Sequence, residues 1–167
     1  GLKVGPGWEE NVRIGPLIDQ KALEKVERLV GAAEGSGAVV HTGGKRHTLG
    51  GSFFTPTILL NADDNALISK EEIFGPVAVL HPFQTEEEVI ARANDTPYGL
   101  SSYMYSGDLA QIWRVSDALE YGMVGINEPL LATDLAPFGG TKESGIGREG
   151  GRYGLLEYAD IKYRLFG

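Results

Sequence analysis

The alternation of short apolar runs with capped amphipathic segments constrains the fold of this chain more than any other feature of its sequence. β-Branched or continuous apolar runs predict strands at residues 38–42, 53–60, 76–80, 100–105 and 122–127. Pro56 places the second of these at a sheet edge or at a strand start. Because strands that alternate with helices need crossover connections, the pattern predicts an α/β fold with a mostly parallel sheet and helices on its faces.

Helices are predicted where an N-capping side chain precedes apolar residues at helical spacing. Asp19 precedes one such segment, and Asp108 precedes another, which ends at Gly122. Thr85 and Glu88 form a capping box ahead of a further helix. Each predicted helix has a predicted strand next to it in the sequence, as an α/β fold requires.

Charge and composition exclude several functions. The 167 residues include 15 Lys and Arg against 23 Asp and Glu, and the net charge of −8 disfavours nucleic acid and anionic membranes as partners. Cysteine is absent, which excludes disulfides, thiolate metal sites and a thiol nucleophile within this chain. No apolar run approaches the ~20 residues of a bilayer span, so we expect no membrane insertion and a cytoplasmic location. The first residue, Gly1, indicates a processed product or a piece of a longer polypeptide.

Residues 143–151 contain the spacing of a dinucleotide-binding turn, with glycines at Gly145, Gly147 and Gly150. That motif functions only between a buried strand and a helix, with an acidic residue about 20 positions further on. No predicted strand directly precedes the motif, and Leu165 occupies the position of the acid. The segment is therefore interpreted as a loop whose glycines allow positive φ and close packing.

Other motifs for catalysis or metal binding are weak. The histidines His41, His47 and His81 have no carboxylate at metal-ligand spacing, so no metal site is predicted. The sequence has no serine-hydrolase elbow and no phosphate-binding loop. The doublet Asp63 and Asp64 is typical of a solvated turn.

Residues 70–77, KEEIFGPV, differ from these motifs. Glu72 and Phe74 lie two positions apart, just before a strand that begins at a proline. A carboxylate held there can accept two hydrogen bonds from a vicinal diol, and a phenyl ring can pack against a flat heterocycle. The segment is a candidate ligand site.

Five segments together resemble the ordered motifs of the C-terminal part of aldehyde dehydrogenases, and within that superfamily they are most similar to succinate-semialdehyde dehydrogenases. They are GPLI at 15–18, KEEIFGPV at 70–77, NDTPYGL at 94–100, GMVGIN at 122–127 and PFGGTKESGIGRE at 137–149. The resemblance implies that residues 1–158 form the latter part of a catalytic domain. It also implies that residues 159–167 form an oligomerisation strand, and hence a homodimer or homotetramer.

The resemblance also implies roles for individual residues. Glu72 matches a glutamate that binds the nicotinamide ribose of NAD or NADP, and Phe74 matches the aromatic residue beside the nicotinamide. Phe138 matches a residue of the aldehyde tunnel. Ala132 occupies a specificity position that is often serine in succinate-semialdehyde dehydrogenases. The adjacent Thr133 either supplies the missing hydroxyl or only caps its loop.

The family's chemistry needs a cysteine thiolate and a general-base glutamate, which lie N-terminal to the matching region together with the dinucleotide-binding domain. No catalytic residue is therefore assigned in this chain, and the chain alone is predicted to be inactive and to bind no cofactor tightly. The expected activity of the intact enzyme is oxidation of an aldehyde, succinate semialdehyde above others, to the acid. The alternative is a non-catalytic module that uses the same half of the fold for assembly.

Overall fold

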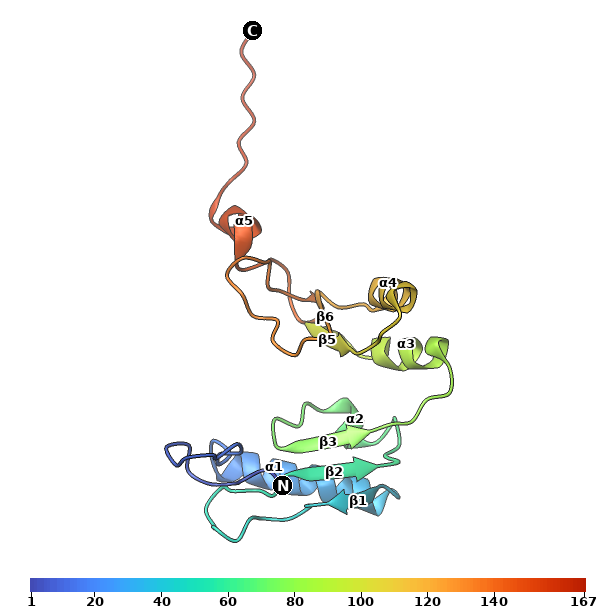
Figure 1. Cartoon of the computed structure of the whole chain (residues 1–167). Coiled ribbons are helices and arrows are strands. Elements are labelled where there is room, and N and C mark those ends of the chain that lie inside the picture. Colours follow the sequence, from blue (N-terminus) through green and yellow to red (C-terminus); the bar gives the residue numbers. More distant parts are fainter. The chain divides into compact units, whose positions relative to one another are not determined.

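The computed structural model describes residues 1–167, which form two compact units, Gly1–Pro82 and Phe83–Gly167 (Figure 1). Each unit combines helices with a small sheet, so the chain is mixed α/β, as the sequence predicts. No helix has both the length and the apolar character needed to cross a membrane.

The first unit is built on α1 (Gln20–Gly35), which packs along a three-stranded sheet (Figure 1). The strands, in spatial order, are β1 (Val39–Thr42), β2 (Thr57–Leu60) and β3 (Val77–Leu80), and the short helix α2 (Leu67–Lys70) lies in the sequence between the last two.

Helix α1 forms as its sequence predicts. The Asp19 side chain accepts a hydrogen bond from the backbone N–H of Ala22 at 2.7 Å, which satisfies a free donor of the first turn. The apolar face of the helix is buried and includes Leu23, Val26, Leu29, Val30 and Ala33. These side chains pack in one cluster with buried residues of the sheet and its loops, and burying each large one contributes roughly 1.5–3 kcal/mol.

The sheet differs from the expected mostly parallel arrangement. β2 pairs in parallel with β3 but antiparallel with β1. A loop without a helix joins β1 to β2, and this connection returns the chain in the opposite direction. β2 starts directly after Pro56 and lies in the centre of the sheet, so the proline marks a strand start and not a sheet edge.

The second unit contains the remaining elements: α3 (Glu86–Asn94), β4 (Tyr98–Gly99), β5 (Ser101–Met104), α4 (Leu109–Ala118), β6 (Met123–Ile126), β7 (Thr141–Lys142), α5 (Gly151–Gly154) and the 3₁₀ turn η1 (Leu155–Tyr158). β5 and β6 are parallel and are connected through α4, which is the predicted crossover. β4 and β7 form a separate antiparallel pair. The sheets of this chain are therefore small and mixed.

Both predicted caps of the second unit are present. Thr85 Oγ1 accepts from the N–H of Glu88 at 3.2 Å, while the Glu88 carboxylate accepts from the N–H of Gln84 instead of that of Thr85. Asp108 caps α4, which ends at Ala118, before the predicted stop at Gly122. Glu86 of α3 and Arg114 of α4 form a two-point ion pair that ties the two helices together.

Residues 159–167 form neither helix nor strand and extend away from α5 (Figure 1). Their apolar side chains are exposed, with 103% of Ile161 and 80% of Leu165 accessible. A strand is defined by backbone hydrogen bonds to a neighbouring strand, and this segment belongs to no sheet of the chain. The expected C-terminal strand is therefore not formed here.

Candidate functional site

The loop between α2 and β3 carries Glu72 and Phe74, and its backbone is held against α1. The Lys25 ammonium donates a hydrogen bond to the carbonyl oxygen of Glu72. Arg28, one turn further along α1, pairs with Glu71 at 2.7 Å, and this hydrogen bond lowers the pKa of the Glu71 carboxyl. The loop is thus fixed at two consecutive residues.

Gly75 allows the loop to approach α1 closely. A Cβ atom at this position would lie 2.6 Å from Cγ2 of Val26, well inside van der Waals contact. The apolar core of the first unit therefore reaches the residue directly after Phe74. A side chain at position 75 would push the loop away from the helix.

Phe74 has a backbone φ of 52°, in the left-handed region that bulky side chains avoid. Such a conformation costs about 1–2 kcal/mol, and strain of this kind gathers at ligand sites. It leaves the ring 77% exposed, while the Glu72 side chain is also exposed. The backbone that carries both side chains is thus anchored, while the carboxylate and the ring are exposed, which is compatible with the ligand role predicted for them.

Phe138 is held in the second unit by a two-way backbone bridge to Glu149. Each residue donates its N–H to the other's carbonyl oxygen at 2.7 Å. This bridge joins the segment that follows β6 to the end of the glycine-rich loop. The position of Phe138 therefore depends on residues about ten positions later in the sequence.

A cavity of about 550 Å³ brings the predicted substrate residues together. Its lining is formed by Ala132, Thr133, Asp134, Phe138, Glu149 and Gly150. Three of these residues are the sequence-predicted ones, and Asp134 and Glu149 add two carboxylates that the sequence analysis did not assign. Glu72 and Phe74 belong to the other unit, so the predicted residues fall into two groups, one in each unit.

Thr133 caps its own loop, because its hydroxyl oxygen accepts from the N–H of Leu135 at 3.3 Å. This geometry agrees with the capping alternative raised from the sequence. The hydroxyl still has its own proton, and the side chain is exposed at the cavity, so the capping bond leaves a donor available for a ligand.

The glycine-rich loop at 143–151 is a loop, as predicted. Gly145, Gly147 and Gly150 have φ values of 108°, 99° and 71°, which only glycine adopts readily. The two-residue strand β7 precedes the loop and the four-residue helix α5 follows it, so the buried strand and the long helix of a dinucleotide-binding turn are missing. A Cβ atom at Gly150 would lie 2.7 Å from the carbonyl oxygen of Ala136, which explains the glycine there.

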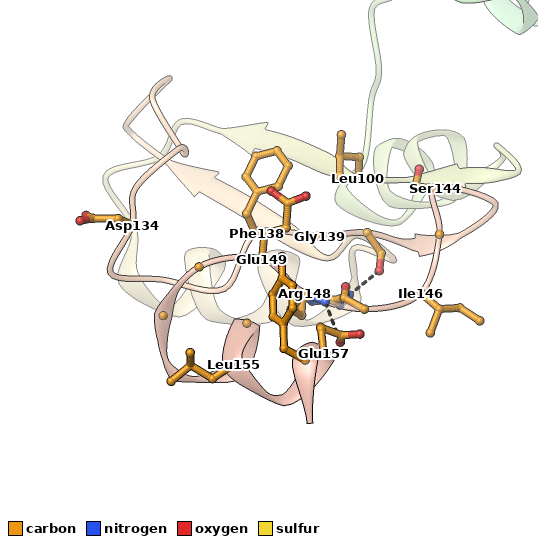
Figure 2. A pocket seen from close by; sticks show the side chains of 17 residues that line it. Leu100, Asp134, Phe138, Gly139, Ser144, Ile146, Arg148, Glu149, Leu155 and Glu157 are labelled. Atoms are coloured by element: carbon orange, nitrogen blue, oxygen red, sulfur yellow. Dashed lines mark hydrogen bonds between the residues drawn. The ribbon is translucent and has the colours of Figure 1, made fainter. Parts of the chain in front are cut away.

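The same loop lines a second cavity, of about 720 Å³, on the side of η1 (Figure 2). Figure 2 shows Arg148 and Glu157 next to one another among the residues that line it, with the ring of Phe138 pointing away from them. Sequence reasoning did not single out Arg148, Glu157 or, in the first unit, Lys25. Lys25 and Glu72 are 47 positions apart, and no local pattern indicates a contact over that separation.

The model of the aldehyde dehydrogenase family matches residues 1–163. A glutarate-semialdehyde dehydrogenase of Pseudomonas aeruginosa is 54% identical over 99% of this chain and 34% of its own length. A succinate-semialdehyde dehydrogenase of Escherichia coli strain K12, named for NADP(+), is 52% identical over 99% of this chain and 34% of its own length.

The solved structures agree with these relatives. The crystal structure of a succinate-semialdehyde dehydrogenase from Burkholderia pseudomallei matches with a TM-score of 0.91 and 52% identity, over 94% of this chain and 33% of that one. This chain belongs to the aldehyde dehydrogenase family. It spans about a third of the length of the curated relatives it matches.

Proposed function

We propose that this chain supplies the C-terminal part of an NAD(P)-dependent aldehyde dehydrogenase that oxidises a short semialdehyde acid to the dicarboxylic acid. The observation that carries the proposal is the cavity that joins Phe138 to Ala132 and Thr133. These are the positions to which the family resemblance assigns the aldehyde, and matched relatives are named for succinate and glutarate semialdehydes.

Glu72 and Phe74 act on the cofactor in this proposal. The Glu72 carboxylate accepts hydrogen bonds from the hydroxyls of the nicotinamide ribose, and the Phe74 ring packs beside the nicotinamide. The support is the anchored loop, which holds the backbone by Lys25 and leaves both side chains free. NAD and NADP differ at the adenosine ribose, which neither residue would contact, so the site is equally suited to both.

The chain itself supplies no nucleophile. The family's chemistry needs a cysteine thiolate as nucleophile, NAD(P), which would supply the hydride acceptor, and a glutamate as general base. This chain contains no cysteine. We therefore propose that it neither turns over an aldehyde nor binds a cofactor tightly by itself, and that its residues act within a longer protein.

The far end of the substrate, away from its aldehyde, carries a carboxylate, which needs hydrogen-bond donors in the tunnel. Ala132 offers only a methyl group. The Thr133 hydroxyl replaces the missing serine as a donor, because its proton is not used in the capping hydrogen bond. The carboxylates of Asp134 and Glu149 line the same cavity and weaken its attraction for an anion. The preference for a semialdehyde acid is thus retained but reduced.

Residues 159–167 serve as the oligomerisation strand, and residues 1–158 as part of the catalytic domain. The exposed alternating side chains of the tail need a partner surface, which a second copy in a homodimer or homotetramer provides. A cytoplasmic location remains our prediction.

An alternative is a non-catalytic assembly module that uses this half of the fold and its tail for assembly. The strained backbone of Phe74 favours the enzyme, because an assembly module would gain nothing from a ring held outward at a positive φ. The alternative keeps the exposed tail but assigns no purpose to the Phe74 conformation.

The test is kcat/KM of the full-length protein for succinate semialdehyde against butanal, an uncharged aldehyde of equal chain length. We expect a preference of about tenfold or more for the semialdehyde acid. A preference for butanal overturns the substrate assignment, and no oxidation of any aldehyde with either cofactor overturns the proposed function. The isolated chain, purified to constant composition, is expected to give no turnover above the blank.

A further inference from the structure

The Glu157 carboxylate lies against the glycine-rich loop. Its Oε1 accepts a hydrogen bond from the backbone N–H of Arg148 at 3.2 Å (Figure 2). A Cβ atom at Gly147 would lie 3.1 Å from the same carboxylate. Gly147, at a φ of 99°, therefore gives Glu157 room to reach the backbone of the loop.

Arg148 continues this contact to the opposite side of the loop. Its Nη1 donates to the carbonyl oxygen of Gly140 at 2.7 Å and to that of Gly147 at 2.8 Å. Glu157 thus holds the backbone of Arg148. The Arg148 guanidinium in turn ties the glycine-rich loop to Gly140, two residues after Phe138. The next residue in the chain, Glu149, forms the two-way bridge to Phe138.

We propose that Glu157 is a positioning residue for the aldehyde cavity, acting through Arg148 and the Glu149–Phe138 bridge on the side chain of Phe138. The proposal rests on the proposed function, because only that function makes the Phe138 cavity a substrate site. Glu157 lines the 720 Å³ cavity and not the smaller one that contains Thr133, so it acts without touching the substrate.

The chemistry of the contact identifies a suitable pair of variants. The contact needs one acceptor oxygen at the end of a side chain of this length, and charge strengthens it. Glu157→Gln keeps such an oxygen, whereas Glu157→Ala removes it. Glu143, an exposed acid on the same loop, provides the matched control as Glu143→Ala because it is not one of the hydrogen-bonding partners in this network.

The experiment compares these variants in the full-length enzyme. For Glu157→Ala we expect KM for succinate semialdehyde to rise about fivefold or more while KM for NAD(P) changes less than about twofold. Glu157→Gln should recover most of the loss, and Glu143→Ala should match the wild type. Hydrogen exchange of the amides at 147–149 should accelerate in Glu157→Ala alone.

Each contrary result has a definite meaning. An unchanged aldehyde KM in Glu157→Ala, or equal increases in the KM values for aldehyde and cofactor, overturns the positioning role. Unchanged exchange at 147–149 overturns the contact itself, whether or not the protein oxidises aldehydes. Faster exchange in Glu157→Ala, combined with a wild type that oxidises no aldehyde, contradicts the proposed function but supports the contact.

Discussion

Lys25 of α1 donates a hydrogen bond to the backbone carbonyl of Glu72 and leaves the Glu72 carboxylate exposed. The backbone of Glu72 thus helps to hold its loop in place, while its carboxylate is exposed to solvent. A substitution of the side chain can therefore test the ligand role of Glu72 without loosening the loop.

Glu72→Gln in the full-length protein should slow hydride transfer about tenfold or more, because a charge-assisted hydrogen bond to the ribose is weakened. The thermal midpoint should stay at the wild-type value, because the Lys25 bond goes to the backbone. Single-turnover stopped-flow measurement of NAD(P)H formation checks the rate. Glu34→Gln, at an exposed acid of α1 outside this loop, serves as the control and should leave that rate nearly unchanged; wild-type kinetics in Glu72→Gln would count against the role.

Two glycine substitutions in the first unit should have opposite effects on stability. Gly75→Ala places a Cβ atom 2.6 Å from Val26 Cγ2 and should lower the free energy of unfolding by about 1–3 kcal/mol. Gly31→Ala, within α1 and with no atom within 4 Å of the new Cβ, should raise it by about 0.5–1 kcal/mol. Urea titrations measure both changes, and equal stabilities of the two variants would contradict the close approach of the loop to α1.

The ion pair between α3 and α4 predicts a pH dependence of stability. The hydrogen bonds from Arg114 hold the pKa of Glu86 below its usual 4.5. The folded state therefore releases the Glu86 proton more readily than the unfolded state does. The ion pair contributes fully to the free energy of unfolding above about pH 4.5, and this contribution is lost as the pH falls through the lower pKa of the folded state.

The wild type should therefore be more stable than Glu86→Gln at pH 7, and this difference should shrink as the pH falls below 4.5. Urea unfolding of both proteins between pH 7 and pH 3 measures the difference, with the exposed Glu87→Gln as the control. A difference that is independent of pH would show that the Glu86 charge does not contribute.

Thr133→Val separates the two roles of this hydroxyl. If its proton serves the substrate carboxylate, kcat/KM for succinate semialdehyde should fall about fivefold or more while that for butanal stays constant. Thr133→Ser keeps the hydroxyl and should behave like the wild type. An equal loss for both aldehydes would show that Thr133 does not bind the substrate carboxylate and only caps its loop, by accepting the hydrogen bond from Leu135.

Deletion of residues 160–167 should convert the full-length oligomer to smaller species, because the exposed side chains of Ile161, Tyr163 and Leu165 lose their partner surface. Light scattering coupled to size exclusion measures the mass. Lys162→Gln, on the alternate side of the tail, should leave the mass unchanged. An unaltered mass after the deletion would contradict the role of the tail in assembly.

The three longer helices, α1, α3 and α4, could be predicted from the sequence because their signals are local. Asp19, Thr85 and Asp108 each cap a helix through a hydrogen bond to a residue two or three positions away. The positive φ values of Gly145 and Gly147 were likewise expected from residue type and from the missing strand and helix around them.

The pairing of strands and the geometry of the site were decided only by the tertiary structure. The direction of β1 against β2, the left-handed backbone of Phe74 and the Lys25–Glu72 bond depend on groups far apart in the sequence. An apolar run shows that a strand forms but not which neighbour it meets, because the pairing is selected by packing over the whole unit. For the same reason, the sequence by itself indicated which residues were candidates for binding a ligand, and the fold decided which of these candidates share a cavity.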